Sequence, residues 1–157
     1  MKDHEEFRTV RGYQLQSSRA LTAAMEDYLE MLYRETLSDH PLRIGSIANK
    51  LNVNPSSATK MVQRLGQLGM VSYQKYGLIR LSEQGKKLGA YLYHRHHIIE
   101  GFLRDVLDHK NCLTETELLE HNVSPETLDA LDDLNQFMAQ YPQILQKFRT
   151  FVEGKKE

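Results

Sequence analysis

The segment RIGSIANKLNVNPSSATKMVQRLGQLGM, residues 43–70, decides the fold. Its first part spaces Ile44, Ile47 and Leu51 along one face of a short amphipathic helix. Asn54-Pro55 then predicts a second helix, because asparagine is a good N-cap and proline suits the first helical position. Two short helices joined by about three residues form a helix-turn-helix.

The flanking segments extend this prediction to a winged helix. Upstream, apolar residues recur at helical spacing from Leu21 to about Leu37. Downstream, VSYQKYGLIRL at residues 71–81 is rich in β-branched and aromatic residues around a Lys-Tyr-Gly turn, which predicts a small hairpin. We therefore expect a mainly α protein, with a winged helix-turn-helix, a small β-hairpin wing and a helical dimerisation domain.

The charge distribution supports a nucleic-acid partner. Residues 43–90 contain eight basic residues and one acidic residue, a net charge of +7. Residues 100–157 contain twelve acidic and six basic residues, a net charge of −6. A basic block beside an acidic one is typical of a chain in which one part binds a polyanion.

In a winged helix the second helix of the pair lies in the DNA major groove. Its face opposite Ala58, Met61 and Val62 carries polar groups able to contact base edges and phosphates. The hairpin adds residues that would lie over the backbone or the minor groove. The predicted contacts with double-stranded DNA are Ser56, Ser57, Thr59, Lys60, Gln63, Arg64, Lys75, Tyr76 and Arg80.

Composition limits the other classes of function. The chain has 157 residues, of which 40% are hydrophobic and 26% charged, as in a globular protein. It has one cysteine, so no disulfide within the chain is expected. No apolar run is long enough to cross a membrane, and the first residues contain no apolar signal region. We expect a cytoplasmic protein with no membrane partner.

Three predicted helices each carry clustered metal-binding residue types. The stretch YHRHHIIE, residues 93–100, places His96 and Glu100 one turn apart in a helix expected from Ser82 to about Leu107. MEDYLE, in the first predicted helix, places two carboxylates one turn apart. TETELLEHN, which follows YHRHHIIE in the chain, places two carboxylates and a histidine on one helical face. The candidate ligands are Asp27, Glu30, His96, Glu100, Glu117, Glu120 and His121.

Each of these groups alone is more often a solvated surface pair, but the three together have fewer such explanations. Carboxylates dominate and no thiol takes part, a donor set that suits Mn²⁺ or Fe²⁺ better than a softer ion. This set of carboxylates and histidines could also hold two ions per subunit. His94 is read as a solvated neighbour, and Cys112 lies off the face of Glu117.

At these motifs the sequence resembles the manganese transport regulators, the short branch of the diphtheria toxin repressor family of metal-dependent repressors. The motifs are MEDYLE, NPSSATKMVQRL, KYGLIRLSEQGKKLG, RHHIIEGFL and ELLEHNVS, in the family order from about residue 22 to 134. The resemblance implies a metal-activated repressor of metal uptake genes, with an N-terminal winged helix and a helical dimerisation domain.

The resemblance also implies six metal ligands, and these are the candidates above without Glu100. In iron-responsive relatives a methionine stands in place of Asp27 and a cysteine in place of Glu117, so the resemblance favours manganese. His97 stands where relatives often have an acid, which leaves a second metal position open.

The expected domains are an N-terminal extension at residues 1–20, a DNA-binding domain at 21–90 and a metal-binding and dimerisation domain at 91–157. Ser124-Pro125 predicts a helix whose Leu128, Leu131, Leu134 and Phe137 pack on the chain or on a partner in a homodimer. Alternatives are a winged-helix regulator that responds to Fe²⁺, Zn²⁺ or an organic ligand, and a small metalloenzyme. No nucleophile motif or phosphate-binding loop favours an enzyme.

Overall fold

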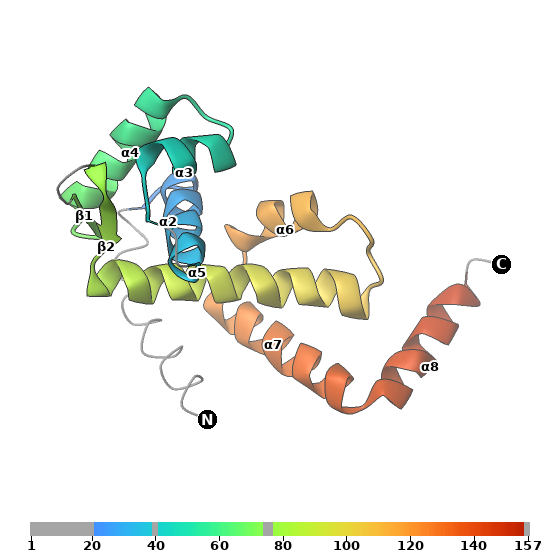
Figure 1. Ribbon diagram of the computed structural model, residues 1–157. Helices are drawn as coiled ribbons and strands as arrows, with labels where there is room; N and C mark the ends of the chain where they lie inside the picture. Colours follow the sequence, from blue (N-terminus) through green and yellow to red (C-terminus); the bar gives the residue numbers. More distant parts are fainter. Residues whose placement is uncertain (1–20, 39–40, 74–76, 156–157) are drawn as a thin grey trace. The chain divides into compact units, whose positions relative to one another are not determined.

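The computed structural model describes residues 21–38, 41–73 and 77–155. These residues fall into two compact units, the first ending at His94 and the second beginning at Arg95. Residues 1–20, the expected extension, lie outside the described part, and the expected domain limits remain a prediction. The elements in chain order are α2 (Ala23–Thr36), α3 (Ile44–Lys50), α4 (Pro55–Gln67), β1 (Val71–Tyr73), β2 (Ile79–Leu81), α5 (Glu83–Gly101), the π-helix η2 (Phe102–Val106), α6 (Leu113–Glu120), α7 (Pro125–Gln140) and α8 (Pro142–Glu153) (Figure 1).

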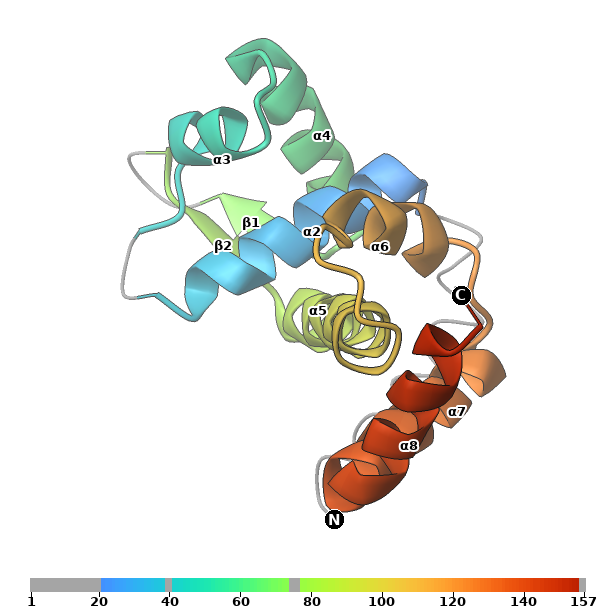
Figure 2. The ribbon, with the colours of Figure 1, turned by 90° about the vertical axis from the view of Figure 1, so that its right-hand side faces the viewer.

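The first unit has the expected winged-helix order of helix, helix-turn-helix and hairpin. α4 contacts α2, α3 and β1, and β1 pairs with β2 in antiparallel register, Val71 opposite Leu81 (Figure 2). Leu29, Ile47 and Leu65 are fully buried and bring one apolar face of α2, α3 and α4 into a common core. The predicted mainly α winged helix is therefore confirmed.

Local signals in the sequence fix where α4 begins and ends. Asn54 Oδ1 accepts a hydrogen bond from the Ser56 backbone N–H at 2.9 Å, and Pro55 is the first helical residue, as expected. At the other end Gly69 has a φ of 72°, in the left-handed region that favours glycine. The Met70 N–H then bonds to the Leu65 carbonyl, a closing pattern typical of helix ends.

Two glycines let other parts of the first unit approach α5 closely. A Cβ atom on Gly89 would lie 2.7 Å from Tyr33 Cβ, and one on Gly85 would overlap the Met70 carbonyl oxygen. Glycine in a helix interior usually costs stability relative to alanine. Their role is instead to make room for α2 and for the chain entering the hairpin.

The second unit contains the end of α5 and all later helices. The helix expected to continue to about Leu107 is α-helical only to Gly101 and then becomes η2. Asn135 of α7 donates a hydrogen bond to the Ile98 carbonyl at 2.8 Å, and Arg149 of α8 donates one to the Asp105 carbonyl at 2.6 Å. Side chains from later helices thus bind backbone carbonyls around the π-helix.

Ser124 caps α7 as predicted, since its hydroxyl accepts a hydrogen bond from the Thr127 N–H at 3.2 Å. The helix stops at Gln140, and Pro142 begins α8 after Tyr141. This break was not predicted, although a proline disfavours helix in the residue before it. Within the described residues, no helix is both long and apolar enough to cross a membrane.

Candidate metal-binding and DNA-binding residues

The first unit presents two of the predicted metal ligands on α2. Asp27 and Glu30 lie one turn apart; Asp27 is exposed and Glu30 is buried. Arg34, one turn further along, donates a hydrogen bond from Nη2 to Glu30 Oε1 at 2.5 Å. This charge-assisted hydrogen bond satisfies one oxygen of the buried carboxylate, so Glu30 is held by a cation on its own helix.

The second unit brings together three more of the predicted ligands. His96 Nδ1 of α5 lies 2.9 Å from Glu120 Oε2, and both side chains are buried. His121, the residue that follows α6, has its Nε2 3.8 Å from Glu120 Oε1. The sequence spacing placed Glu120 and His121 near each other, but their association with His96 depends on the packing of α6 on α5.

The geometry of the buried pair suits a metal ligand. In the tautomer that donates from Nδ1–H to Glu120 Oε2, the neutral ring of His96 carries its lone pair on Nε2. A histidine oriented by a carboxylate in this way is the usual arrangement at protein metal sites. The donor types are carboxylate and imidazole, which fit Mn²⁺ or Fe²⁺.

Two other predicted ligands have different surroundings. Glu117 is exposed on α6, whereas Glu120 one turn later is buried. Glu100 Oε2 lies 3.4 Å from Arg104 Nη1. Arg104 also donates two hydrogen bonds to Asp105, which hold the pKa of that carboxyl below its usual value. Glu100 therefore belongs to a charged group at the end of α5.

Sequence reasoning missed two arginines beside these ligands, Arg34 and Arg95. The buried Arg95 has Nη2 3.4 Å from His121 Nδ1. Because a guanidinium only donates hydrogen bonds, Nδ1 is the acceptor in this contact. The i, i+4 spacing of Glu30 and Arg34 is visible in the sequence and could have indicated the first pair. Arg95 lies inside YHRHHIIE, but nothing in that stretch indicates its partner.

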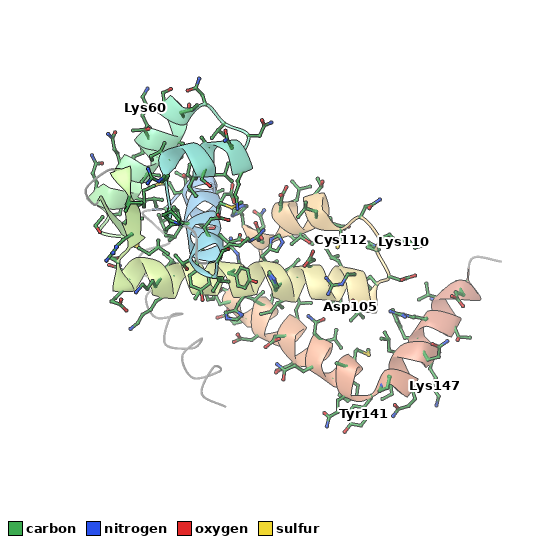
Figure 3. The ribbon with its side chains drawn as sticks, in the orientation of Figure 1. Lys60, Asp105, Lys110, Cys112, Tyr141 and Lys147 are labelled. Atoms are coloured by element: carbon green, nitrogen blue, oxygen red, sulfur yellow. The ribbon has the colours of Figure 1, made fainter. Side chains whose placement is uncertain are left out.

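The predicted DNA-reading helix is α4, and most of its candidate residues are solvent-exposed. Ser56, Ser57, Lys60, Gln63 and Arg64 are exposed, and Figure 3 shows Lys60 on the outer side of the helix. The Ser56 hydroxyl donates to Asn54 Oδ1 and the Thr59 hydroxyl to the Pro55 carbonyl. Those two hydroxyls support the helix start, which leaves the longer side chains better suited to contact bases and phosphates.

The predicted wing is described only in part. Arg80 is exposed on β2 between the buried Ile79 and Leu81, and it pairs across the hairpin with Ser72. Lys75 and Tyr76 lie outside the described residues. Arg80 is therefore presented to solvent on the face of the hairpin opposite the core.

Comparison with known proteins defines the class. Residues 20–85 match the family described as "Iron dependent repressor, N-terminal DNA binding domain" and residues 82–149 match "Iron dependent repressor, metal binding and dimerisation domain". The chain belongs to this family of winged-helix, metal-dependent transcriptional regulators. Within it the chain is 39% identical over 127 residues to the HTH-type transcriptional regulator MntR of Lysinibacillus sphaericus (strain C3-41), covering 80% of this chain and 91% of that protein. The resemblance to the manganese transport regulators is thus confirmed.

Solved structures give the same result. The manganese regulator SloR has a TM-score of 0.65 and 30% identity, and the metal-dependent transcriptional regulator MtsR has 0.67 and 30%. ScaR with bound Zn²⁺ has a TM-score of 0.61 and 32% identity. Each match covers 72% of this chain and 54% of the other, so the chain spans about half the length of these solved relatives.

Proposed function

We propose that the protein is a manganese-responsive repressor that binds double-stranded DNA as a homodimer and controls metal uptake genes. The observation that carries the proposal is the buried pair of His96 and Glu120 beside His121, in a chain that also has an exposed, basic recognition helix. We assign the protein no catalytic role and expect it to act in the cytoplasm.

The proposed metal ligands are Asp27, Glu30, His96, Glu117, Glu120 and His121. Glu100 is a further candidate for a second ion. The bound ion supplies positive charge that offsets the repulsion among these carboxylates. In a homodimer, the bound ion then favours one arrangement of the DNA-binding helices, at a spacing that matches two half-sites.

The energetic requirement for such a switch is small. An ion that binds the DNA-competent arrangement more tightly than the other by a few kcal/mol changes the occupancy of the operator by two or more orders of magnitude.

The decisive experiment is a titration of Mn²⁺ into metal-stripped protein, with free Mn²⁺ followed by electron paramagnetic resonance. We expect the wild type to remove one or two ions per subunit from solution. Glu120→Ala and the closer isostere Glu120→Gln should remove fewer and should lose Mn²⁺-dependent DNA binding while remaining folded. The matched control is Glu115→Ala, because Glu115 is an exposed carboxylate on the same helix.

Uptake that is unchanged in both Glu120 variants would contradict the ligand assignment. No uptake by the wild type at micromolar Mn²⁺ would contradict the proposed manganese response. DNA binding should be compared with and without the ion at one fixed salt concentration, because phosphate contacts make affinity strongly dependent on salt.

A response to iron or zinc is the alternative within the family, whose two domain descriptions name iron. The predicted ligands contain no thiol, and Cys112 is buried with its Sγ directed at the Glu100 carbonyl, 4.0 Å away. This donor set favours manganese. Parallel titrations with Fe²⁺ under anaerobic conditions and with Zn²⁺ distinguish these alternatives. The ion to which the protein responds is the one that gives DNA binding at its cellular concentration.

A further inference from the structure

Glu30 is a proposed metal ligand, and it also forms an ion pair with an arginine on its own helix. Arg34 Nη2 binds Glu30 Oε1 at 2.5 Å, and the Glu30 side chain is only 9% exposed. The same guanidinium lies over the ring of Tyr93 in α5, with Arg34 Cζ 5.7 Å from the ring centroid. Tyr93 in turn packs against Tyr33, their ring centroids 5.8 Å apart.

These contacts fix the position of the guanidinium charge. α5 lies close to α2 at Gly89, because this glycine has no side chain that would separate its helix from Tyr33 of α2. The ring of Tyr93 gives the cation a favourable surface, and the ion pair directs it at Oε1. Arginine cannot lose its proton at any physiological pH, so this charge is permanent.

We propose that Arg34 sets the metal affinity of the protein by competing with the metal ion for Glu30. This inference rests on the proposed function, since it takes Glu30 as a ligand. Arg34 and a metal ion bound by Glu30 would both draw on the negative charge of one carboxylate. The permanent charge nonetheless repels a divalent ion on the same carboxylate and already stabilises Glu30 in its absence. Arg34 therefore weakens metal binding. The protein then responds at a higher Mn²⁺ concentration than it would with the same ligands and no charge at position 34.

The test compares Arg34→Gln, which removes the charge, with Arg34→Lys, which keeps it. Mn²⁺ uptake is followed by electron paramagnetic resonance in the full-length protein. We expect Arg34→Gln to bind Mn²⁺ about tenfold more tightly, the size expected for one unit charge partly screened by water beside a divalent ion. Arg34→Lys should stay within about twofold of the wild type, since it retains the unit charge.

A double-mutant cycle shows whether the effect passes through Glu30. In a Glu30→Gln background, replacement of Arg34 by Gln should raise the Mn²⁺ affinity by clearly less than in the wild-type background, because only the direct repulsion between Arg34 and the ion is then removed. A change of equal size in both backgrounds, or weaker binding by Arg34→Gln in otherwise folded protein, would overturn the proposal. Should Arg34→Gln unfold, Arg34→Met replaces it, because its unbranched side chain keeps the apolar contact with Tyr93.

The outcome for Arg34 is separable from that for the proposed function. If wild type and Arg34→Gln both leave Mn²⁺ in solution, the manganese response and the role of Arg34 fail together. If the wild type binds Mn²⁺ and Glu120→Ala does not, but Arg34→Gln and the wild type have the same affinity, only the role of Arg34 is wrong.

Discussion

At the scale of single residues, Gly85 gives the sharpest prediction of stability. Gly85→Ala places a Cβ atom on the Met70 carbonyl oxygen, which is backbone and cannot turn aside. We expect the substitution to lower the free energy of unfolding by about 1–3 kcal/mol. Urea denaturation followed by circular dichroism measures it. Gly45→Ala is the matched control, because a Cβ there meets nothing within 4 Å, and alanine in a helix should stabilise by up to about 1 kcal/mol. Equal stabilities for the two variants would contradict the close approach at Gly85.

Some residue roles could be predicted from the sequence and others could not. The N-caps Asn54 and Ser124 were predicted and are confirmed, because capping depends on residues only two or three positions away. The role of Gly85 could not be predicted, because it depends on Met70 in the hairpin region. The contact of His96 with Glu120 joins residues 24 positions apart, so spacing alone named both ligands without pairing them.

At the scale of elements, α4 carries the prediction about DNA. Lys60 is exposed on its outer side, where an ammonium group can contact a phosphate (Figure 3). Lys60→Ala should weaken operator binding and reduce the slope of log affinity against log salt by about 0.9, the value for one lost phosphate contact. Fluorescence anisotropy at several salt concentrations measures both quantities. Lys147→Ala, an exposed lysine on α8, should change neither, and an unaltered slope in Lys60→Ala would exclude the phosphate contact.

The elements themselves show where local patterns stop being sufficient. Apolar periodicity predicted α2 from Leu21 to about Leu37, within two residues of its observed bounds, and predicted the two helices α3 and α4, because each of the three buries one continuous face. It did not predict that α5 passes into a π-helix at Phe102. Asn135 and Arg149 bind carbonyls there from 37 and 44 positions away, and no short window of sequence contains that information. The break before Pro142 was locally readable and was simply missed.

At the scale of the whole molecule, the expected homodimer can be tested through the second unit. Phe137 and Tyr141 are exposed, and their rings lie against each other at a tilt of 44° with centroids 4.8 Å apart; Ile144 follows on α8. An aromatic pair left in solvent on a dimerisation domain is a natural subunit contact. Phe137→Lys should shift the protein from dimer towards monomer at micromolar concentration, as measured by sedimentation equilibrium with Mn²⁺ present. It should also weaken binding to an operator with two half-sites far more than binding to a single half-site.

Leu37→Lys is the matched control for that experiment, because Leu37 is also an exposed apolar residue and lies at the end of α2 in the first unit. It should leave both the sedimentation profile and the operator affinity unchanged. A Phe137→Lys protein that remains fully dimeric would place the interface on another surface, whereas a wild type that is monomeric with Mn²⁺ present would contradict the dimer itself. If only the interface is misplaced, metal-dependent binding of a dimer to two half-sites is still expected. If the wild type is a monomer, the protein must bind each half-site separately, and metal can act only within one subunit.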